Sequence, residues 1–481
     1  MEKKVATQTT LPKKLVGKKI FVGVLLFLIL ALPVLWIATH QGQPSKKAAA
    51  PSSPVVAGNT YYVSKNGNNA DGSSWATAWN ELGNIVWDKV QPGDTILIDG
   101  GTSGMTYSST LTIIKSGTAG SPITIKMAPD ARRNGQVKIF GGRNTPLPYC
   151  GQAGYNDQSS GVRGSGIDFG SSAHIIVDGT KWDGIQVYGH SSDGIEYNGA
   201  SDITLRNTEI FDNGSISGSN TDRPGVHPVG TNLVFDQVNV HDNGQDGFQT
   251  GGPVNSFTLR HSWLHNTRSN PSQGDDVAFN YPCTHQDGIQ IYSGGTQTNF
   301  LIESSIFGPG LMQGLLLGDN HVAPTAVLDN VTIRNDLFIQ SYQGTNIMGY
   351  RVWPSREFVN DQHWTIDHIT SYTMTGDQVI VGGTGHQITN SVFYGGQFDF
   401  NNPLAASSGN CQYKTRGKSA YLGGQTVNPE FVGKVDSYTG SVSLDTLSHT
   451  DFSLQPASPC KGKGSSITSV AQLIRTANRS S

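Results

Sequence analysis

The sequence predicts an all-β solenoid, in which short strands form coils that stack along one axis. A unit of three short strands recurs six times between Gly166 and Asn390, and its first strand pairs a glycine with an apolar residue. That first strand occupies residues 165–168, 193–196, 224–227, 246–249, 287–290 and 313–316. A unit this small cannot bury its own apolar face, so its copies must stack on one another. The composition agrees, because 59 Gly and only 14% charged residues are typical of a β protein with many tight turns.

The N-terminal part of the predicted solenoid begins with a strand near Tyr61. Residues 75–89 predict a short amphipathic helix, because apolar residues recur there at helical spacing. These residues are Trp79, Leu82, Ile85 and Val86. Such a helix could cap the open end of the solenoid, whose terminal coil needs a cover. Short strands divided by Gly or Pro follow at residues 95–98, 111–115, 123–127 and 137–140.

From residue 165 onward, one apolar residue in each first strand is expected to point into the coil. These central residues are Ile167, Ile195, Val226, Phe248, Ile289, Leu315, Ile347 and Val379. The second strand of several units ends at an Asn, namely Asn207, Asn335 and Asn390. Because Asn tolerates the left-handed backbone conformation, these residues are predicted to form sharp corners and to hydrogen-bond along the stack.

Three stretches carry a resemblance to a known family. They are the opening at 61–96 (Tyr-Tyr-Val-Ser to Gly-Asp-Thr-Ile), Gly-Thr-Ala-Gly-Ser-Pro-Ile-Thr-Ile-Lys at 117–126, and the closing segment 428–459. The chain resembles right-handed parallel β-helix proteins of the pectate-lyase-like superfamily, which share the pectin lyase fold. The resemblance implies a β-helix domain over residues 59–465, followed by a C-terminal tail over 466–481. It leaves the reaction open, because the superfamily includes lyases, hydrolases, epimerases and non-enzymatic adhesins.

The N-terminus has the features of a membrane anchor. Six Lys precede an apolar run from Ile20 to Ala38, so segment 1–40 predicts a single transmembrane helix with a cytoplasmic N-terminus. A cleaved signal peptide is the alternative. The predicted location is therefore the cell membrane with an extracellular C-terminal domain, or secretion after cleavage. Residues 41–58 are rich in Pro, Ser and Ala and predict a flexible linker.

Charge and cysteine content limit the partners and the compartment. Residues 1–40 carry six Lys and one Glu, so the rest of the chain carries a net charge of −8. An acidic exterior argues against nucleic acid as a partner, because phosphate binding needs a basic face. Four Cys in an exported chain could form two disulfides. Cys411 and Cys460 would close the C-terminal segment, whereas pairing of Cys150 with Cys283 stays open.

A polar stripe is predicted on the outer face of the first strands. Alternate side chains of a strand face outward, so the residue after each central apolar residue should point to solvent. This column reads Asp168, Glu196, His227, Gln249, Gln290, Leu316, Met348 and Ile380. Strands about 4.8 Å apart would make Glu196 to Gln290 one contiguous stripe. The glycines before the central residues are expected to face outward too and to leave a shallow trough for a sugar ring.

The stripe and the Asp-Gly turns beside it supply the candidate site. The catalytic candidates are Glu196, His227, Asp246, His285 and Asp287. His285-Gln-Asp-Gly-Ile-Gln290 resembles a His-x-Asp-Gly motif of other β-helix proteins. The candidates for substrate binding are Asp193, Gln249, Gln290, Arg351 and Arg356. Asp-Gly is also ordinary turn chemistry, so stabilisation of turns is the alternative role of these Asp residues.

Three reactions on a polysaccharide fit these residues. Glycoside hydrolysis needs two carboxyls, and Asp246, Asp287 and Glu196 are candidates. β-Elimination needs a base, His227 or His285, and a cation, either an Arg or Ca²⁺. The two residues that would hold Ca²⁺ are Asp275 and Asp276. An epimerase would use similar groups. The sequence thus predicts an extracellular lyase or glycoside hydrolase, with a non-catalytic glycan-binding or adhesion module as the alternative.

Overall fold

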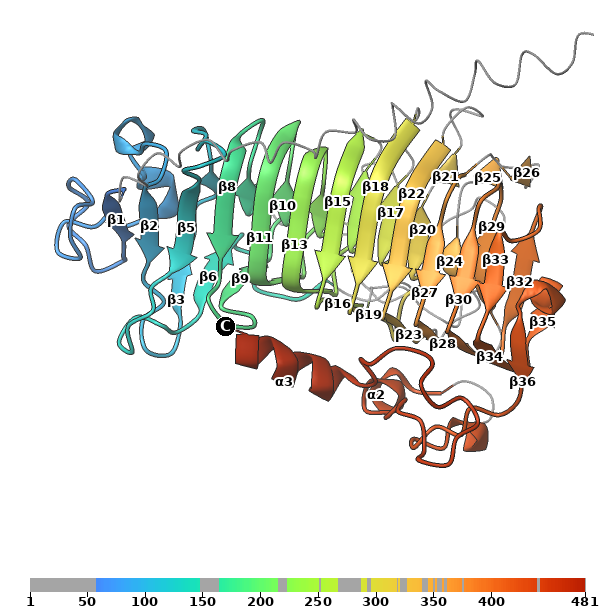
Figure 1. The fold of residues 1–481 in the computed structure, drawn as a ribbon. Helices are drawn as coiled ribbons and strands as arrows, with labels where there is room; N and C mark the ends of the chain where they lie inside the picture. Colours follow the sequence, from blue (N-terminus) through green and yellow to red (C-terminus); the bar gives the residue numbers. More distant parts are fainter. Residues whose placement is uncertain are drawn as a thin grey trace, which may run out of the picture. The chain divides into compact units, whose positions relative to one another are not determined.

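The strands of this protein stack coil upon coil, and each coil pairs in parallel with the next (Figure 1). The computed structural model describes residues 58–147, 164–214, 223–250, 252–266, 287–291, 296–317, 319–320, 327–339, 345–348, 351–352, 357–358, 361–373, 376–438 and 442–480. No helix within these ranges is long and apolar enough to span a membrane. The predicted anchor over 1–40 and the predicted linker up to residue 57 lie outside them.

The stacked strands form three parallel ladders, which we call the first, second and third sheets; the second and third are joined into one 22-stranded sheet. The first sheet contains β4 (Leu111–Thr112), β7 (Ile167–Asp168), β10 (Ile195–Glu196), β12 (Val226–His227), β14 (Phe248–Thr250), β17 (Ile289–Ile291), β20 (Leu315–Leu317), β24 (Thr345–Met348), β29 (Asp377–Val381), β32 (Gln397–Phe400) and β35 (Arg416–Gly417). The second contains β1 (Thr60–Val63), β2 (Thr95–Ile98), β5 (Ile123–Met127), β8 (Ala173–Asp178), β11 (Ala200–Phe211), β13 (Gly230–His241), β15 (Val254–Arg260), β18 (Thr296–Glu303), β22 (Val327–Arg334), β27 (Thr365–Asp367), β30 (Gln387–Thr389) and β33 (Ala406–Ser408).

The third sheet contains β3 (Met105–Tyr107), β6 (Val137–Phe140), β9 (Ile185–Tyr188), β16 (Trp263–His265), β19 (Ile306–Phe307), β23 (Leu337–Ile339), β28 (Thr370–Tyr372), β31 (Val392–Tyr394), β34 (Asn410–Tyr413) and β36 (Gly424–Thr426). The second halves of β11 and β13 also belong to it, because both strands continue through the corner between the second and third sheets. A separate small sheet consists of β21 (Asp319–Asn320), β25 (Arg351–Val352) and β26 (Glu357–Phe358).

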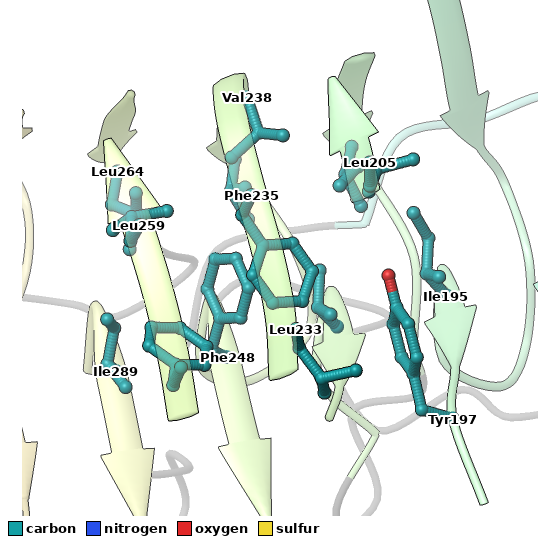
Figure 2. Packing of buried hydrophobic residues seen from close by; sticks show 14 of the residues in the cluster. Ile195, Tyr197, Leu205, Leu233, Phe235, Val238, Phe248, Leu259, Leu264 and Ile289 are labelled. Carbon is teal, nitrogen blue, oxygen red and sulfur yellow. The ribbon is translucent and has the colours of Figure 1, made fainter. Parts of the chain in front are cut away.

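The interior of the stack is the apolar column predicted from the repeats. All eight central residues pair in register along the first sheet, from Ile167 with Ile195 to Ile347 with Val379. Each of them is at most 1% exposed. Figure 2 shows Phe248 facing Phe235 of the second sheet, and their ring centroids are 4.9 Å apart in an edge-to-face contact. The predicted coil register is therefore confirmed.

The corners between the second and third sheets use left-handed residues, as predicted. Asn207, Asn335 and Asn390 have φ values of 57°, 58° and 51°. Their side-chain amides donate hydrogen bonds to the preceding coil, for example from Asn207 to Asp178 Oδ1 at 2.8 Å. Gln237, like several other residues at this corner, is left-handed as well, so Asn is favoured but not required.

A row of alternating charges runs along the outer face of the second sheet, just before these corners. Successive coils place in register Lys126, Asp178, Arg206, Asp236, Arg260, Glu303, Arg334 and Asp367. Arg206 lies 2.8 Å from Asp178, and Arg260 lies 2.9 Å from Asp236. Each charge thus has an opposite charge on the adjacent coils, and this arrangement disfavours like-charge contacts between coils.

The N-terminal segment differs from the prediction. Residues 75–89 contain two single-turn 3₁₀ helices, η1 (Leu82–Asn84) and η2 (Trp87–Lys89), instead of one amphipathic helix. Trp79, Leu82 and Trp87 are buried in the core cluster, whereas Val86 is 40% exposed. The apolar residues therefore do not form one helical face, and Gly83 weakens a helix at this place.

The C-terminal segment covers the outer face of the third sheet. After β36 the chain forms η5 (Val435–Ser437), α2 (Leu444–Ser448) and α3 (Val470–Ser480), whereas η4 (Lys418–Tyr421) precedes β36. Outward-pointing residues such as Ile306 and Leu337 pack with Phe452 and Leu473 in a cluster separate from the coil interior. The predicted disulfide between Cys411 of β34 and Cys460 is present, with a Cα–Cα distance of 5.8 Å. The predicted tail over 466–481 contains α3, whose Leu473 is buried.

Candidate active site

The polar stripe predicted on the first sheet is continuous. Glu196 of β10 pairs with Asp168 of β7 on one side and with His227 of β12 on the other. Gln249 of β14 pairs with Gln290 of β17 further along, and β12 pairs with β14 between them. Residues more than 120 positions apart in the sequence are thereby aligned on one face, at about 4.8 Å per coil.

The open part of the stripe consists of Asp168, Glu196 and His227, which are each partly exposed. Glu196 Oε2 accepts a hydrogen bond from Ser165 Oγ at 2.9 Å. Asp168 Oδ1 accepts one from the backbone N–H of Gly170 at 2.8 Å. Both carboxylates are thus anchored through one oxygen while their side chains remain in contact with solvent.

His227 is the third member of this group, and a carboxylate lies behind it. Its Nδ1 is 3.7 Å from Oδ2 of Asp193, a residue of the turn before β10. The side chain of His227 is 36% exposed, whereas that of Asp193 is 2% exposed. The imidazole therefore has one edge toward a buried carboxylate and part of its surface toward solvent.

The predicted substrate-binding residues Gln249 and Gln290 are covered. Each is 6% exposed, and Nε2 of Gln249 donates a hydrogen bond to Oε1 of Gln290 at 2.7 Å. Leu316 follows them on the next coil and is 3% exposed. The stripe continues by register beyond His227, but its open part ends there.

Asp246 and Asp287, two of the predicted catalytic residues, lie in the turns before β14 and β17. Both are fully buried. Asp246 Oδ1 accepts a hydrogen bond from the backbone N–H of Asp287, and Asp287 Oδ1 accepts one from Gln313 N–H at 3.1 Å. Each carboxylate therefore stabilises the turn of the following coil, which is the alternative role expected of Asp-Gly sequences.

The glycine trough is also absent where it was predicted. A Cβ on Gly194 would lie 2.7 Å from Nδ2 of Asn213, and one on Gly166 would lie 2.3 Å from Cγ1 of Val187. A side chain at either glycine would point into the coil interior and clash there. Close packing in the turn before each first strand therefore requires glycine. The expected outward direction assumed strand alternation, which does not hold in the turn before the strand begins.

Several candidates lie outside the described residues. These are His285, Arg356, Asp275 and Asp276, and also Cys150 and Cys283. The backbone of Arg351 belongs to β25. Within the described ranges, no group of three or more His, Cys, Asp or Glu side chains could hold a metal ion. A Ca²⁺ site at Asp275 and Asp276 remains a prediction from the sequence.

A second titratable cluster, which sequence reasoning missed, lies on the outer face of the third sheet. His241 Nε2 is 3.1 Å from Glu209 Oε1, and its Nδ1 is 2.8 Å from Asp242 Oδ2. Burial lowers the pKa of His241, but the bonds to Asp242 and Glu209 outweigh it and raise that pKa to about 9. Burial and the charge of Glu209 raise the pKa of Asp183, in the turn before β9, to about 7.

Comparison with known proteins supports the fold. No family model and no curated protein matches the sequence. Among solved structures, XylC in complex with xylose is 12% identical, with a TM-score of 0.50 over 80% of this chain and 81% of that chain. Pectate lyase Pel9A is 17% identical, with a TM-score of 0.45 and coverage of 84% and 91%. A rhamnogalacturonan lyase is 13% identical, with a TM-score of 0.45 and coverage of 87% and 98%. At 12% identity the likeness to XylC shows the fold alone, a parallel β-helix.

Proposed function

We propose that this protein is a carbohydrate-active enzyme that cleaves a polysaccharide on the open part of the stripe. The observation that carries the proposal is the alignment of three partly exposed acid–base side chains, Asp168, Glu196 and His227, on successive coils. Asp168 and Glu196 are register partners on adjacent strands, which lie about 4.8 Å apart, and retaining glycosidases hold their two carboxyls about 5–5.5 Å apart. One would protonate the leaving oxygen, and the other would attack the anomeric carbon.

Hydrolysis is favoured over β-elimination by the charges of the stripe. β-Elimination of a uronate needs a cation that neutralises the substrate carboxylate. The outward positions from Asp168 to Gln290 hold two carboxylates, one imidazole and two amides, with no Lys or Arg at these five described positions. A lyase would have to take its cation from elsewhere, such as the predicted Arg356 or Ca²⁺.

A linear polymer suits the shape of this site. The stripe crosses the coils, so a bound chain would run along the axis of the solenoid and contact equivalent positions of successive coils. Thr112 of β4 pairs with Asp168 and is exposed, which extends the open surface by one coil. The proposed substrate is an extracellular polysaccharide, in keeping with the anchor or signal peptide predicted over residues 1–40.

The test is a screen of the purified full-length protein on neutral and uronate-containing polysaccharides. New reducing ends without an unsaturated, ultraviolet-absorbing product would support hydrolysis, whereas the unsaturated product would indicate a lyase. Asp168→Asn and Glu196→Gln should each lower kcat by about 10²–10⁴-fold with the fold intact. Asp287→Asn is the matched control and should keep its turnover. Retention of a polysaccharide without cleavage would favour the glycan-binding alternative.

A further inference from the structure

We infer that Asp193 is a positioning residue that holds His227 as the proton acceptor of this site. The inference rests on the proposed function, since it assigns the roles of two residues within the same stripe. Asp193 is 1% exposed, and its Oδ2 is 3.7 Å from Nδ1 of His227 on the following coil. This separation is longer than a hydrogen bond, but catalytic contacts are often long until substrate binds, and a buried carboxylate beside one imidazole nitrogen is the group that orients a histidine base.

The fold brings these two side chains together through the tight turns of adjacent coils. Asp193 lies two residues before Ile195, and His227 lies one residue after Val226, the register partner of Ile195. The imidazole must therefore lean back along its coil toward the turn to approach Asp193. Gly194 directly follows Asp193, and Gly225 lies two residues before His227. At both glycines, backbone or side-chain atoms lie within 3.0 Å of where a Cβ would be. This packing fixes the turn that carries Asp193.

The consequence is a defined tautomer. A carboxylate beside Nδ1 favours the proton on that nitrogen, which leaves the lone pair of Nε2 directed away from Asp193. On the preceding coil His227 pairs with the charged Glu196. On the following coil Val226 pairs with Phe248, so the residue next to His227 there is the neutral Gln249. When Nε2 accepts a proton, the imidazolium that forms is therefore stabilised by nearby negative charge.

The proton transfer fits the second step of a retaining hydrolysis. Water loses a proton to Nε2 of His227 while its oxygen bonds to the anomeric carbon. The bond from that carbon to the carboxylate of the covalent intermediate breaks, and the carboxylate leaves with the electron pair. The proton on Nε2 then passes to the carboxylate that had protonated the leaving oxygen in the first step. The resting enzyme is restored without any further reactant.

The tautomer can be measured in the full-length protein without substrate, by ¹⁵N NMR of the imidazole nitrogens. The chain has 13 His, so the signals of His227 are identified by their absence in His227→Gln. The neutral His227 should carry its proton on Nδ1. In Asp193→Asn the amide of the new side chain can donate to Nδ1, so the proton should move to Nε2. Asp246→Asn changes another buried carboxylate at the same turn position and should leave the tautomer of His227 unchanged.

The kinetic test separates positioning from folding. Asp193→Asn should lower kcat by about 10²-fold or more with little change in KM, because it removes the orientation of the base rather than a substrate contact. A wild-type His227 with its proton on Nε2 would overturn the inference even if Asp193→Asn fails to fold. If the wild-type protein cleaves a polysaccharide but its His227 carries the proton on Nε2, the pairing of Asp193 with His227 is refuted and the proposed function stands. An Nδ1–H tautomer that switches in Asp193→Asn, in a protein that cleaves no polysaccharide, refutes the proposed function and supports the pairing.

Discussion

Replacement of Asp183 by Asn should stabilise the protein at about pH 8 and change its stability little at about pH 4. The pKa of this carboxyl is raised from 3.8 to about 7 by burial and by the charge of Glu209. The native state therefore binds the proton more tightly than the unfolded chain. The stability that this provides is fully present below pH 3.8 and is lost as the pH rises through about 7. Asn is neutral at every pH and reproduces the protonated acid.

The size of the effect follows from the two pKa values. The pKa of Asp183 in the unfolded chain and its pKa in the folded protein differ by about three units, and each unit corresponds to about 1.4 kcal/mol. Asp183→Asn should therefore raise the free energy of unfolding at about pH 8 by at most about 4 kcal/mol. His241 adds a second pH dependence with the same sign. Its pKa is raised from 6.5 to about 9, so the stability it contributes is present below 6.5 and is lost as the pH rises through about 9. Both groups make the wild-type protein less stable toward alkaline pH.

The assay is urea unfolding of wild type and variant at the two pH values, followed by circular dichroism. Asp88→Asn is the control, because the side chain of Asp88 is 95% exposed and its loss should change the unfolding free energy by about 0.5 kcal/mol or less. If Asp183→Asn is no more stable than wild type at about pH 8, Asp183 is already ionised at little cost. The assigned coupling between Asp183 and Glu209 would then be wrong.

Three further predictions test the core, the C-terminal segment and the N-terminus. Ile289→Ala should lower the free energy of unfolding by about 2–5 kcal/mol, because it leaves a cavity between Phe248 and Leu315. An unchanged midpoint of urea unfolding would contradict the register. Cys460→Ser should cost about 2–4 kcal/mol by releasing the C-terminal segment, and calorimetry should show it. The full-length chain should stay in the membrane fraction after a high-salt wash, whereas a soluble product that begins near residue 40 would refute the anchor.

The fold could be predicted from the sequence because one short pattern specifies both the strand and its neighbours. A glycine followed by an apolar residue marks the start of each first strand, and stacking then pairs equivalent residues. This is why the sequence alone predicts that Ile195, Val226 and Phe248 are register partners, as they are in the structure. The left-handed corners were predictable for the same reason, since a repeated Asn has few other structural roles. The two 3₁₀ helices within residues 75–89 were not predictable, because apolar spacing alone does not distinguish one amphipathic helix from two tight turns.

The candidate site was predictable only in part. Register placed Glu196 beside His227, but it could not show which residues of the stripe are open, because register fixes only the pairing of strands. Gln249 and Gln290 are polar and outward by register, and yet they are buried. The cluster around Asp183 had no repeat to reveal it. Asp183 lies in a non-repeating turn, and its pKa is raised by burial and by the charge of Glu209 on another coil.

The division of the stripe into an open and a covered part determines how a polymer can approach. From Thr112 to His227 the outward positions of the first sheet are accessible, whereas Gln249, Gln290 and Leu316 are buried. A polysaccharide that follows the stripe can therefore extend toward the N-terminal coils. It must end, bend or leave the surface near His227. The proposed base thus lies at the closed end of the accessible surface, and the carboxyl pair lies between the base and the open end. The accessible run covers about four coils and spans roughly 14 Å from Thr112 to His227 at the spacing of parallel strands, which favours cleavage of a chain that projects outward past His227.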